Sequence, residues 1–248
     1  MDEPHHHRFG ILAHSAEGAA LCFLEFCRNG FRDIGQHMHP DVMLDCEAMG
    51  LVMPAWDAGD HSAVRGFLSQ SVERLAGGGC DFFACPDNTA HIALESAGPE
   101  LPLPGLNIGD VVAERAAALG MTRVAVLGTR FTMAGPVYRR ALPAVGIEPR
   151  FPAEAERTDI DRIIFDELVE GQFLDGSRRR YIEIIERLKH EEGCDGVALV
   201  CTEIPLLVTA DASPVPILDS TRLLARAAFE VCTGKRAFPT WRGGPIGQ

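Results

Sequence analysis

The sequence predicts an α/β protein of two pseudo-symmetric domains, each a parallel sheet flanked by helices. Two observations lead to this prediction. Short apolar runs alternate with helical periods along the chain, as in repeated strand–helix units. The 248 residues also exceed the length at which a single core is most comfortable. Because ligands bind at the carboxyl ends of strands in open parallel sheets, we expect the active site in the inter-domain cleft.

The strands expected in the first half are short apolar runs that end in turn residues. They cover residues 9–14, 41–45, 80–85 and 106–108. Helices are expected after Ser15, over residues 62–76 and from Ala90. The acidic stretch between 45 and 62 is expected to be a loop.

The second half repeats the pattern. Strands are expected over residues 123–127, from 146, over 196–200 and from 216, with helices over about 133–142, 160–168, 178–190 and 222–231. We expect the last helix to return to the first domain, which gives domains 1–110 plus 219–248 and 111–218. Residues after Phe238 lack apolar periodicity and are expected to form a loop.

The composition indicates a soluble globular protein, with 46% hydrophobic and 23% charged residues. A formal net charge of −12 disfavours binding to nucleic acid or to an anionic membrane, so we expect a small-molecule partner. Apolar stretches end well before the roughly 20 residues of a membrane-spanning helix, and no apolar signal core opens the chain. These observations favour a cytoplasmic protein.

Metal and nucleotide sites are not expected. The eight cysteines form no CxxC pair, and most are expected to be reduced core residues. His37 and His39 lack neighbouring ligands, and residues 5–7, three histidines, are expected to be a frayed terminus. No phosphate-binding glycine loop or nucleotide fingerprint is present, so no cofactor is expected.

Three motifs stand at strand ends and together carry more information than composition. They read PDNTAH at residues 86–91, LGTRFTM at 127–133 and CTEIPLL at 201–207, and DST follows at 219–221. In this combination and order the chain resembles the aspartate/glutamate racemase family, within the Asp/Glu/hydantoin racemase superfamily. The resemblance spans nearly the full chain and does not specify the substrate.

The resemblance implies that an α-proton is removed and returned by one cysteine on each face of the substrate, without pyridoxal phosphate. Thiols suit this role because their ordinary pKa lies near 8.5. Family members read Pro-Cys-Asn-Thr where this chain has Asp87, whereas Cys201 is retained. We therefore expect Asp87 and Cys201 to be the catalytic pair and to share one proton, which raises the pKa of Asp87.

Two alternatives concern the same turn. Asp87 can simply cap the following helix. Cys85, two residues earlier, can be a displaced substitute for the missing cysteine, although a buried core cysteine is the favoured interpretation.

Further site residues follow from the resemblance, which implies that polar side chains and helix-start amides hold the substrate's carboxylate and amino group. His91 and Glu203 are expected to orient or tune the catalytic groups. His14 is either part of the site or a buried, hydrogen-bonded histidine. The expected substrate-binding residues are Ser15, Asn88, Thr89, Thr129, Thr132 and Thr202.

A distal carboxylate on the substrate would lack an obvious charge partner in this sequence. Members that act on acidic amino acids place basic side chains in the loop after the second strand and near the segment equivalent to residues 170–172. Here residues 40–64 contain no Lys or Arg, and the segment 170–172 has the neutral Gln172 in place of a basic side chain. Aspartate is therefore a doubtful substrate, and a neutral, larger or cationic compound is given equal weight. Residues 178–180, three arginines, are expected to be a solvated helix face.

The sequence thus predicts an isomerase, a cofactor-independent amino-acid racemase or epimerase that uses Cys201 and Asp87. One alternative is a decarboxylase or isomerase of the same superfamily with Cys201 as the sole proton donor. Another is a non-catalytic ligand-binding protein. A homodimer is expected, since two-fold dimers are the commonest soluble oligomers and fit the resemblance.

Overall fold

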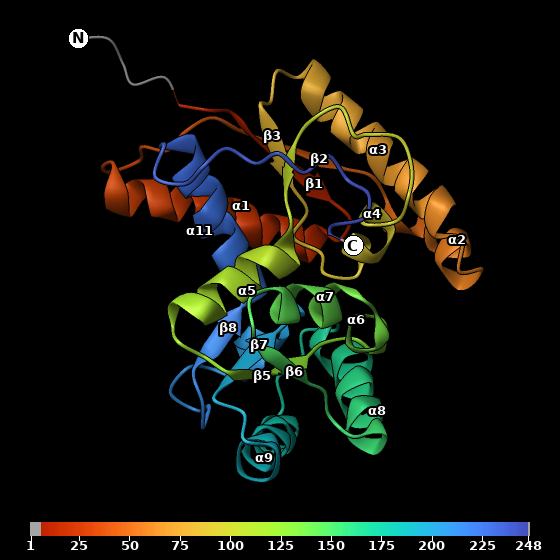
Figure 1. Cartoon of the computed structure of the whole chain (residues 1–248), viewed down its shortest axis with the longest axis vertical. Coiled ribbons are helices and arrows are strands. Elements are labelled where there is room, and N and C mark those ends of the chain that lie inside the picture. Colours follow the sequence, from red (N-terminus) through yellow and green to blue (C-terminus); the bar gives the residue numbers. More distant parts are fainter. Residues whose placement is uncertain (1–5, 248) are drawn as a thin grey trace. The chain divides into compact units, whose positions relative to one another are not determined.

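The chain folds into two compact units, each built on its own four-stranded parallel sheet (Figure 1). The computed structural model describes residues 6–247. Unit 1 comprises Met1–Ile108 with Thr221–Gln248, and unit 2 comprises Gly109–Ser220. The predicted fold class, two parallel sheets flanked by helices, is confirmed.

The sheet of unit 1 has the strand order β2-β1-β3-β4. The chain moves from β1 outward to β2 and then crosses back to β3, so right-handed crossovers place helices on both faces. Its elements are β1 (Phe9–Ala13), α1 (Ala16–Asp33), β2 (Val42–Cys46), α3 (His61–Gly77), β3 (Phe82–Ala84), α4 (Ala90–Leu94) and β4 (Gly105–Leu106).

Alternate side chains of the central strands cover the two faces of this sheet. Phe9 lies 5.0 Å from Phe26 of α1 and 5.3 Å from Phe82, between ring centroids. Leu12 and Phe83 point the other way and share a core cluster with the apolar residues of α3. Because both faces are covered, all five residues of β1 are buried.

The acidic stretch after β2 is not the expected loop. It contains a short helix η1 (Met49–Leu51) and α2 (Met53–Asp57). Pro54 stands in the first turn of α2, where a missing N–H costs nothing. Val52 is buried and anchors the segment in the core cluster beside α3.

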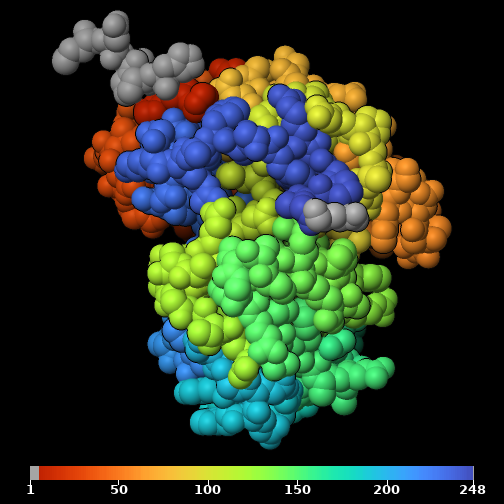
Figure 2. All heavy atoms as spheres, viewed as in Figure 1, coloured from red at the N-terminus to blue at the C-terminus, as the bar shows by residue number. Residues whose placement is uncertain are grey.

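The two ends of the described chain lie on unit 1. Figure 2 shows the dark blue C-terminal segment on the surface of this unit. It has no helix or strand from Thr233 to residue 247, as expected, but Trp241 O accepts from Gly105 N at 2.7 Å and Gly244 N donates to Leu94 O at 2.8 Å. The expectation of a frayed terminus was wrong for His7, whose N–H donates to Cys232 O, while residue 5 lies outside the described residues.

The sheet of unit 2 has the order β6-β5-β7-β8, the same topology as unit 1. Its strands are β5 (Arg123–Leu127), β6 (Glu148–Arg150), β7 (Gly196–Leu199) and β8 (Ile217–Asp219). Its helices are α5 (Ile108–Ala118), α6 (Arg130–Ala134), α7 (Val137–Ala144), α8 (Glu154–Ile163), the π-turn η2 (Ile164–Leu168), α9 (Asp175–Glu192) and α10 (Ile204–Leu207), and α11 (Ser220–Cys232) leads back to unit 1.

Two expectations for this half need correction. The helix expected over 133–142 is divided into α6 and α7 because Gly135 and Pro136 interrupt it. The expected helix over 160–168 is the end of α8 followed by the π-turn. Helix α5 was not predicted at all.

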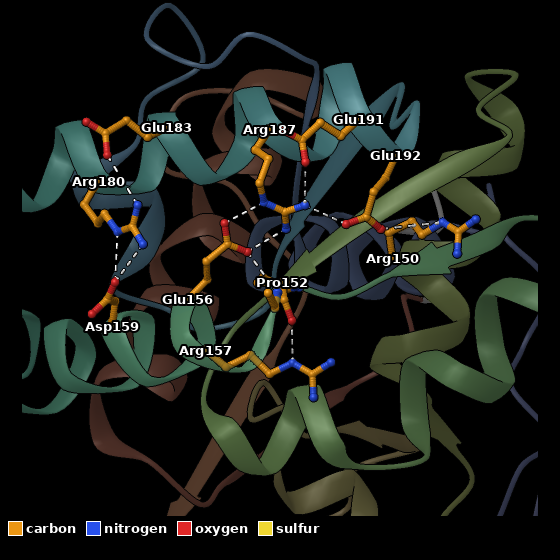
Figure 3. A network of polar contacts seen from close by, with 11 residues as sticks. Arg150, Pro152, Glu156, Arg157, Asp159, Arg180, Glu183, Arg187, Glu191 and Glu192 are labelled. Atoms are coloured by element: carbon orange, nitrogen blue, oxygen red, sulfur yellow. Dashed lines mark hydrogen bonds and ion pairs between the residues drawn. The ribbon is translucent and has the colours of Figure 1, made fainter.

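Charged pairs join α8 to α9 in unit 2 (Figure 3). Arg187 donates to both carboxylate oxygens of Glu156 at 2.6 Å and to Glu192 at 2.8 Å. Arg180 lies 2.8 Å from Asp159, so one of the three arginines expected on a solvated face forms an ion pair between helices. In the described part of the chain, no helix is long and apolar enough to cross a membrane.

Candidate active site

His14 and Asp87 meet at the carboxyl end of the first sheet. His14 directly follows β1 and Asp87 lies three residues after β3, and these neighbouring parallel strands pair Ile11 with Ala84. Nδ1 of His14 is 2.8 Å from Oδ2 of Asp87. Their side chains are only 4% and 14% exposed, so the bond forms largely out of water.

Asp87 also caps α4, because its Oδ1 accepts from the N–H of Ala90 at 3.1 Å. Burial raises the pKa of Asp87, but the attraction and hydrogen bond of His14 and the Ala90 N–H outweigh it, so the pKa lies below its ordinary value. The expected rise in this pKa is therefore wrong. The cause is the imidazole of His14, whose pairing with Asp87 was not foreseen.

His14 is hydrogen-bonded at both ring nitrogens. Nε1–H of Trp56 donates to Nε2 of His14 at 3.0 Å, and the two rings are T-shaped with centroids 5.8 Å apart. Since Nε2 accepts a hydrogen bond, Nδ1 carries the proton that is donated to Asp87. Burial lowers the pKa of His14, but the carboxylate of Asp87 raises it above its ordinary value.

Among the other unit 1 candidates, His91 contacts the same turn. His91 is fully buried, with Nδ1 2.9 Å from the Asp87 backbone oxygen and Nε2 accepting from Ile108 N at 3.2 Å. Asn88 is buried and Thr89 half-buried, and Ser15 precedes α1 without a side-chain capping bond.

Cys85 is a buried core residue. Its exposure is 0%, and burial, followed by the nearby charge of Asp87, raises the pKa of its thiol well above the ordinary value. A thiol in this position stays protonated and cannot serve as a base. The favoured interpretation of Cys85 is thus confirmed.

In unit 2, Cys201 lies two residues after β7, in a partly exposed turn with Thr202 and Glu203. Its Sγ donates to Oε2 of Glu203 at 2.9 Å. The side chain of Cys201 also packs against the core cluster that contains Tyr181. Cys201 is therefore a thiol with a carboxylate partner in reach.

Thr129 and Thr132 stand at the end of the neighbouring strand β5. Thr129 caps α6, since its Oγ1 accepts from Thr132 N at 3.3 Å, and the two hydroxyl oxygens are 3.2 Å apart. A Cβ at Gly128 would approach Cγ2 of Val200 to 2.6 Å and its backbone oxygen to 3.0 Å. Only glycine therefore allows this close packing beside the residue that precedes Cys201.

One expectation of ligand binding, the contribution of helix starts, is altered. The helices after these turns, α4, α6 and α10, have 5, 5 and 4 residues, so their starts contribute little dipole. In residues 6–247, no group of three or more His, Cys, Asp or Glu side chains is arranged to hold a metal ion.

Comparison with known proteins shows the family to which the chain belongs. Residues 23–228 match the model of the Asp/Glu/hydantoin racemase family. The chain belongs to this family. As a family member it is an enzyme, an isomerase of the amino-acid racemase type.

Individual relatives agree with the family assignment. The broad specificity amino-acid racemase RacX of Bacillus subtilis (strain 168) is 23% identical over 168 residues, covering 68% of this chain and 72% of its own. A candidate Asp/Glu racemase from Yersinia pestis superposes with a TM-score of 0.82 at 27% identity, covering 91% and 99% of the two chains. An aspartate racemase homologue from Pyrococcus horikoshii gives a TM-score of 0.79 at 23% identity, with coverage of 91% and 99%.

The sequence analysis did not single out Trp56, which contacts the candidate site residue His14. Trp56 lies in the stretch expected to be a loop, 42 positions from the histidine to which it donates. No local pattern indicates such a bond. The pairing of His14 with Asp87 could have been inferred, because neighbouring parallel strands end at the same edge.

Proposed function

We propose that this member of the racemase family is a cofactor-independent amino-acid racemase or epimerase in which Asp87 and Cys201 act on opposite faces of the substrate α-carbon. One observation carries the proposal. Strands β3 and β7 occupy the same position in two sheets of the same order, and an acid–base side chain follows each of them. Asp87 takes the place of the cysteine that family members have after the first of these strands.

The protonation states of the two groups are complementary. Asp87 is a carboxylate with a lowered pKa, whereas the thiol of Cys201 donates to Glu203. In one direction, the C–H bond breaks, Asp87 takes the proton, and the electron pair stays on the α-carbon. Cys201 then delivers its S–H proton to the other face and is left as thiolate. The reverse direction starts from protonated Asp87 and the thiolate.

The polar residues at the strand ends hold the substrate in this proposal. Glu203 and His91 position the reacting side chains, as their contacts with Cys201 and with the Asp87 backbone support. The carboxylate and amino group of the substrate are assigned to Ser15, Asn88, Thr89, Thr129, Thr132 and Thr202.

The proposed substrate has no distal carboxylate. The first two arginines after the segment 40–64 already have partners: Arg65 donates to the backbone of Leu94 and Pro99, and Arg74 pairs with Asp45 at 2.7 Å. A free carboxylate on the substrate therefore gains no charge partner from them.

We further propose that the enzyme works as a cytoplasmic homodimer. Two-fold dimers are the commonest soluble oligomers, and a net charge of −12 is unsuited to anionic membranes. Light scattering of the purified protein and fractionation of cells test these two points.

The decisive experiment is proton NMR in deuterium oxide with chiral chromatography, over a panel of neutral, basic and acidic amino acids and substituted malonates. The wild type is expected to exchange an α-proton and lose configuration, and Asp87→Asn and Cys201→Ala are each expected to lose at least 100-fold. Asp60→Asn is the matched control, because Asp60 caps α3 through Ala63 N but has no histidine partner. Cys46→Ser, at an exposed cysteine, is the control for Cys201.

The other outcomes are distinct. Release of carbon dioxide that depends on Cys201 but not on Asp87 supports the single-cysteine reaction instead. Saturable ligand binding without any exchange, unchanged in Cys201→Ala, supports a binding protein.

A further inference from the structure

A chain of two hydrogen bonds runs from the indole of Trp56 through the imidazole of His14 to the carboxylate of Asp87. We propose that His14 and Trp56 are positioning residues that hold Asp87 in its proton-accepting form, through a fixed Nδ1–H tautomer of His14. This inference rests on the proposed racemase function, in which Asp87 accepts the α-proton.

The geometry permits one arrangement of protons. The indole of Trp56 can only donate, so Nε2 of His14 must offer its lone pair across the 3.0 Å contact. The carboxylate of Asp87 can only accept while ionised, so Nδ1 must carry hydrogen across the 2.8 Å contact. The opposite tautomer of His14 loses both bonds, because it turns N–H toward N–H and a lone pair toward the carboxylate.

In this proposal, the bond from Trp56 keeps His14 neutral against the opposing effect of the Asp87 carboxylate. A second proton on His14 must go to Nε2, where it displaces the N–H of Trp56. Trp56 therefore opposes the protonation that Asp87 favours. With His14 neutral, the negative charge stays on Asp87, whose second oxygen accepts from the Ala90 N–H. A neutral hydrogen-bond donor leaves Asp87 a stronger base than an imidazolium partner would.

Other ionisable groups near the Trp56–His14–Asp87 hydrogen bonds do not replace His14 in this role. Cys85 and Cys22 are fully buried, and burial raises the pKa of both thiols, to about 12 for Cys22. His91 uses its Nδ1 and Nε2 on backbone groups. His61 contacts the ring of Trp56, at 5.7 Å between centroids, on the indole rather than on His14.

Trp56 can be tested without removing its packing. Its ring and Ala55 pack against the core cluster that holds Leu12, while α2 itself is largely exposed. Phenylalanine at position 56 keeps an aromatic ring there and removes only the N–H. The matched control is Trp241→Phe, which removes the other indole N–H of the chain, bonded to Gly244 O in the same unit.

The first measurement is the tautomer of His14, read from nitrogen-15 chemical shifts in histidine-labelled protein, with His14→Asn providing the assignment. At pH 7 the wild type is expected to show protonated Nδ1 and unprotonated Nε2. Trp56→Phe is expected to move the protonation of Nε2 to higher pH by about one unit, and Trp241→Phe to leave it unchanged. An Nε2–H tautomer or an imidazolium in the wild type at pH 7 would overturn the proposal.

The second measurement is the pH profile of kcat. In Trp56→Phe the acid limb is expected to move up by about one pH unit with KM within twofold, because His14 becomes charged sooner. His14→Leu is expected to raise the acid limb as well, since buried Asp87 then lacks its partner, and His14→Asn to restore it partly through an amide donor. Circular dichroism of each variant confirms folding.

The two proposals fail separately. If the wild type exchanges no α-proton on any amino acid, the racemase function fails while the tautomer remains measurable. If the wild type racemises but His14→Leu and Trp56→Phe keep the wild-type pH profile, the two hydrogen bonds have only a structural role. This inference is then wrong.

Discussion

The Sγ atom of Cys201 lies 2.9 Å from Oε2 of Glu203, two residues further along the chain, and donates to it. A carboxylate this close stabilises the thiol and disfavours the thiolate, since two negative charges would face each other. In the proposed reaction, this contact favours the proton-donating form of Cys201.

Replacing this carboxylate should change the reactivity of Cys201 in a defined direction. In Glu203→Gln, alkylation of Cys201 by iodoacetamide at pH 7 is expected to be several-fold faster, because the repulsion of the thiolate is gone. Racemisation is expected to fall at the same time. The rates are measured in a Cys46→Ser background, and an unchanged alkylation rate would show that Glu203 does not control the thiol.

Alkylation should also discriminate among the eight cysteines. Only Cys46 is exposed and Cys201 partly exposed, whereas the other six are buried. Brief treatment of the folded protein is expected to modify these two, as read by peptide mass spectrometry, and activity is expected to follow Cys201 alone. Modification of Cys85 before Cys201 in the folded protein would contradict the burial described above.

Gly128→Ala is expected to lower activity more than its small volume suggests. The added Cβ meets Val200 at 2.6 Å at Cγ2 and 3.0 Å at the backbone oxygen, and Val200 precedes Cys201. The end of β7 must shift, and a displacement near 1 Å can cost about 100-fold in rate. Gly176→Ala in α9 is the control, since its Cβ meets nothing within 4 Å and helix propensity improves. Activity and thermal unfolding are measured for both variants.

Glu156→Gln should destabilise the protein by about 1–3 kcal/mol at pH 7, because it breaks the partly buried pair with Arg187. Burial raises the pKa of Glu156, but the hydrogen bonds from Arg187 and Ala153 lower it below its ordinary value of 4.5. The contribution is thus present above pH 4.5 and lost as the pH falls through the lower folded pKa.

Urea unfolding at pH 7 and at acid pH measures this difference, which should shrink on acidification. Glu183→Gln is the control, because that side chain is 63% exposed and lies 3.4 Å from Arg180. Its effect is expected to stay below about 0.5 kcal/mol. Equal losses for the two variants would contradict the assignment.

The strands and the motif residues could be predicted because both depend on local sequence. Residues 123–127 were predicted with the bounds of β5, since an apolar run between turn residues defines a buried strand. Asp87 and Cys201 could be singled out because they follow such runs directly.

The contacts that set the chemistry could not be predicted in the same way. The lowered pKa of Asp87 depends on His14, which is 73 positions away, and the tautomer of His14 depends on Trp56 in an unpredicted helix. Periodicity does not indicate such pairings. The strand order can suggest that His14 and Asp87 lie at the same sheet edge, but no local pattern indicates the bond from Trp56. The break at Gly135 and Pro136 was in contrast a local signal, and it was overlooked.

The repeated strand order has an evolutionary consequence. Asp87 is bonded to His14 and Ala90 in unit 1, and Cys201 to Glu203 in unit 2, so each acid–base group depends on neighbours encoded in its own part of the chain. Within these bonds, a substitution at His14 acts on Asp87 and a substitution at Glu203 acts on Cys201. The repeated strand order therefore allows the side chains that follow β3 and β7 to vary with different local partners.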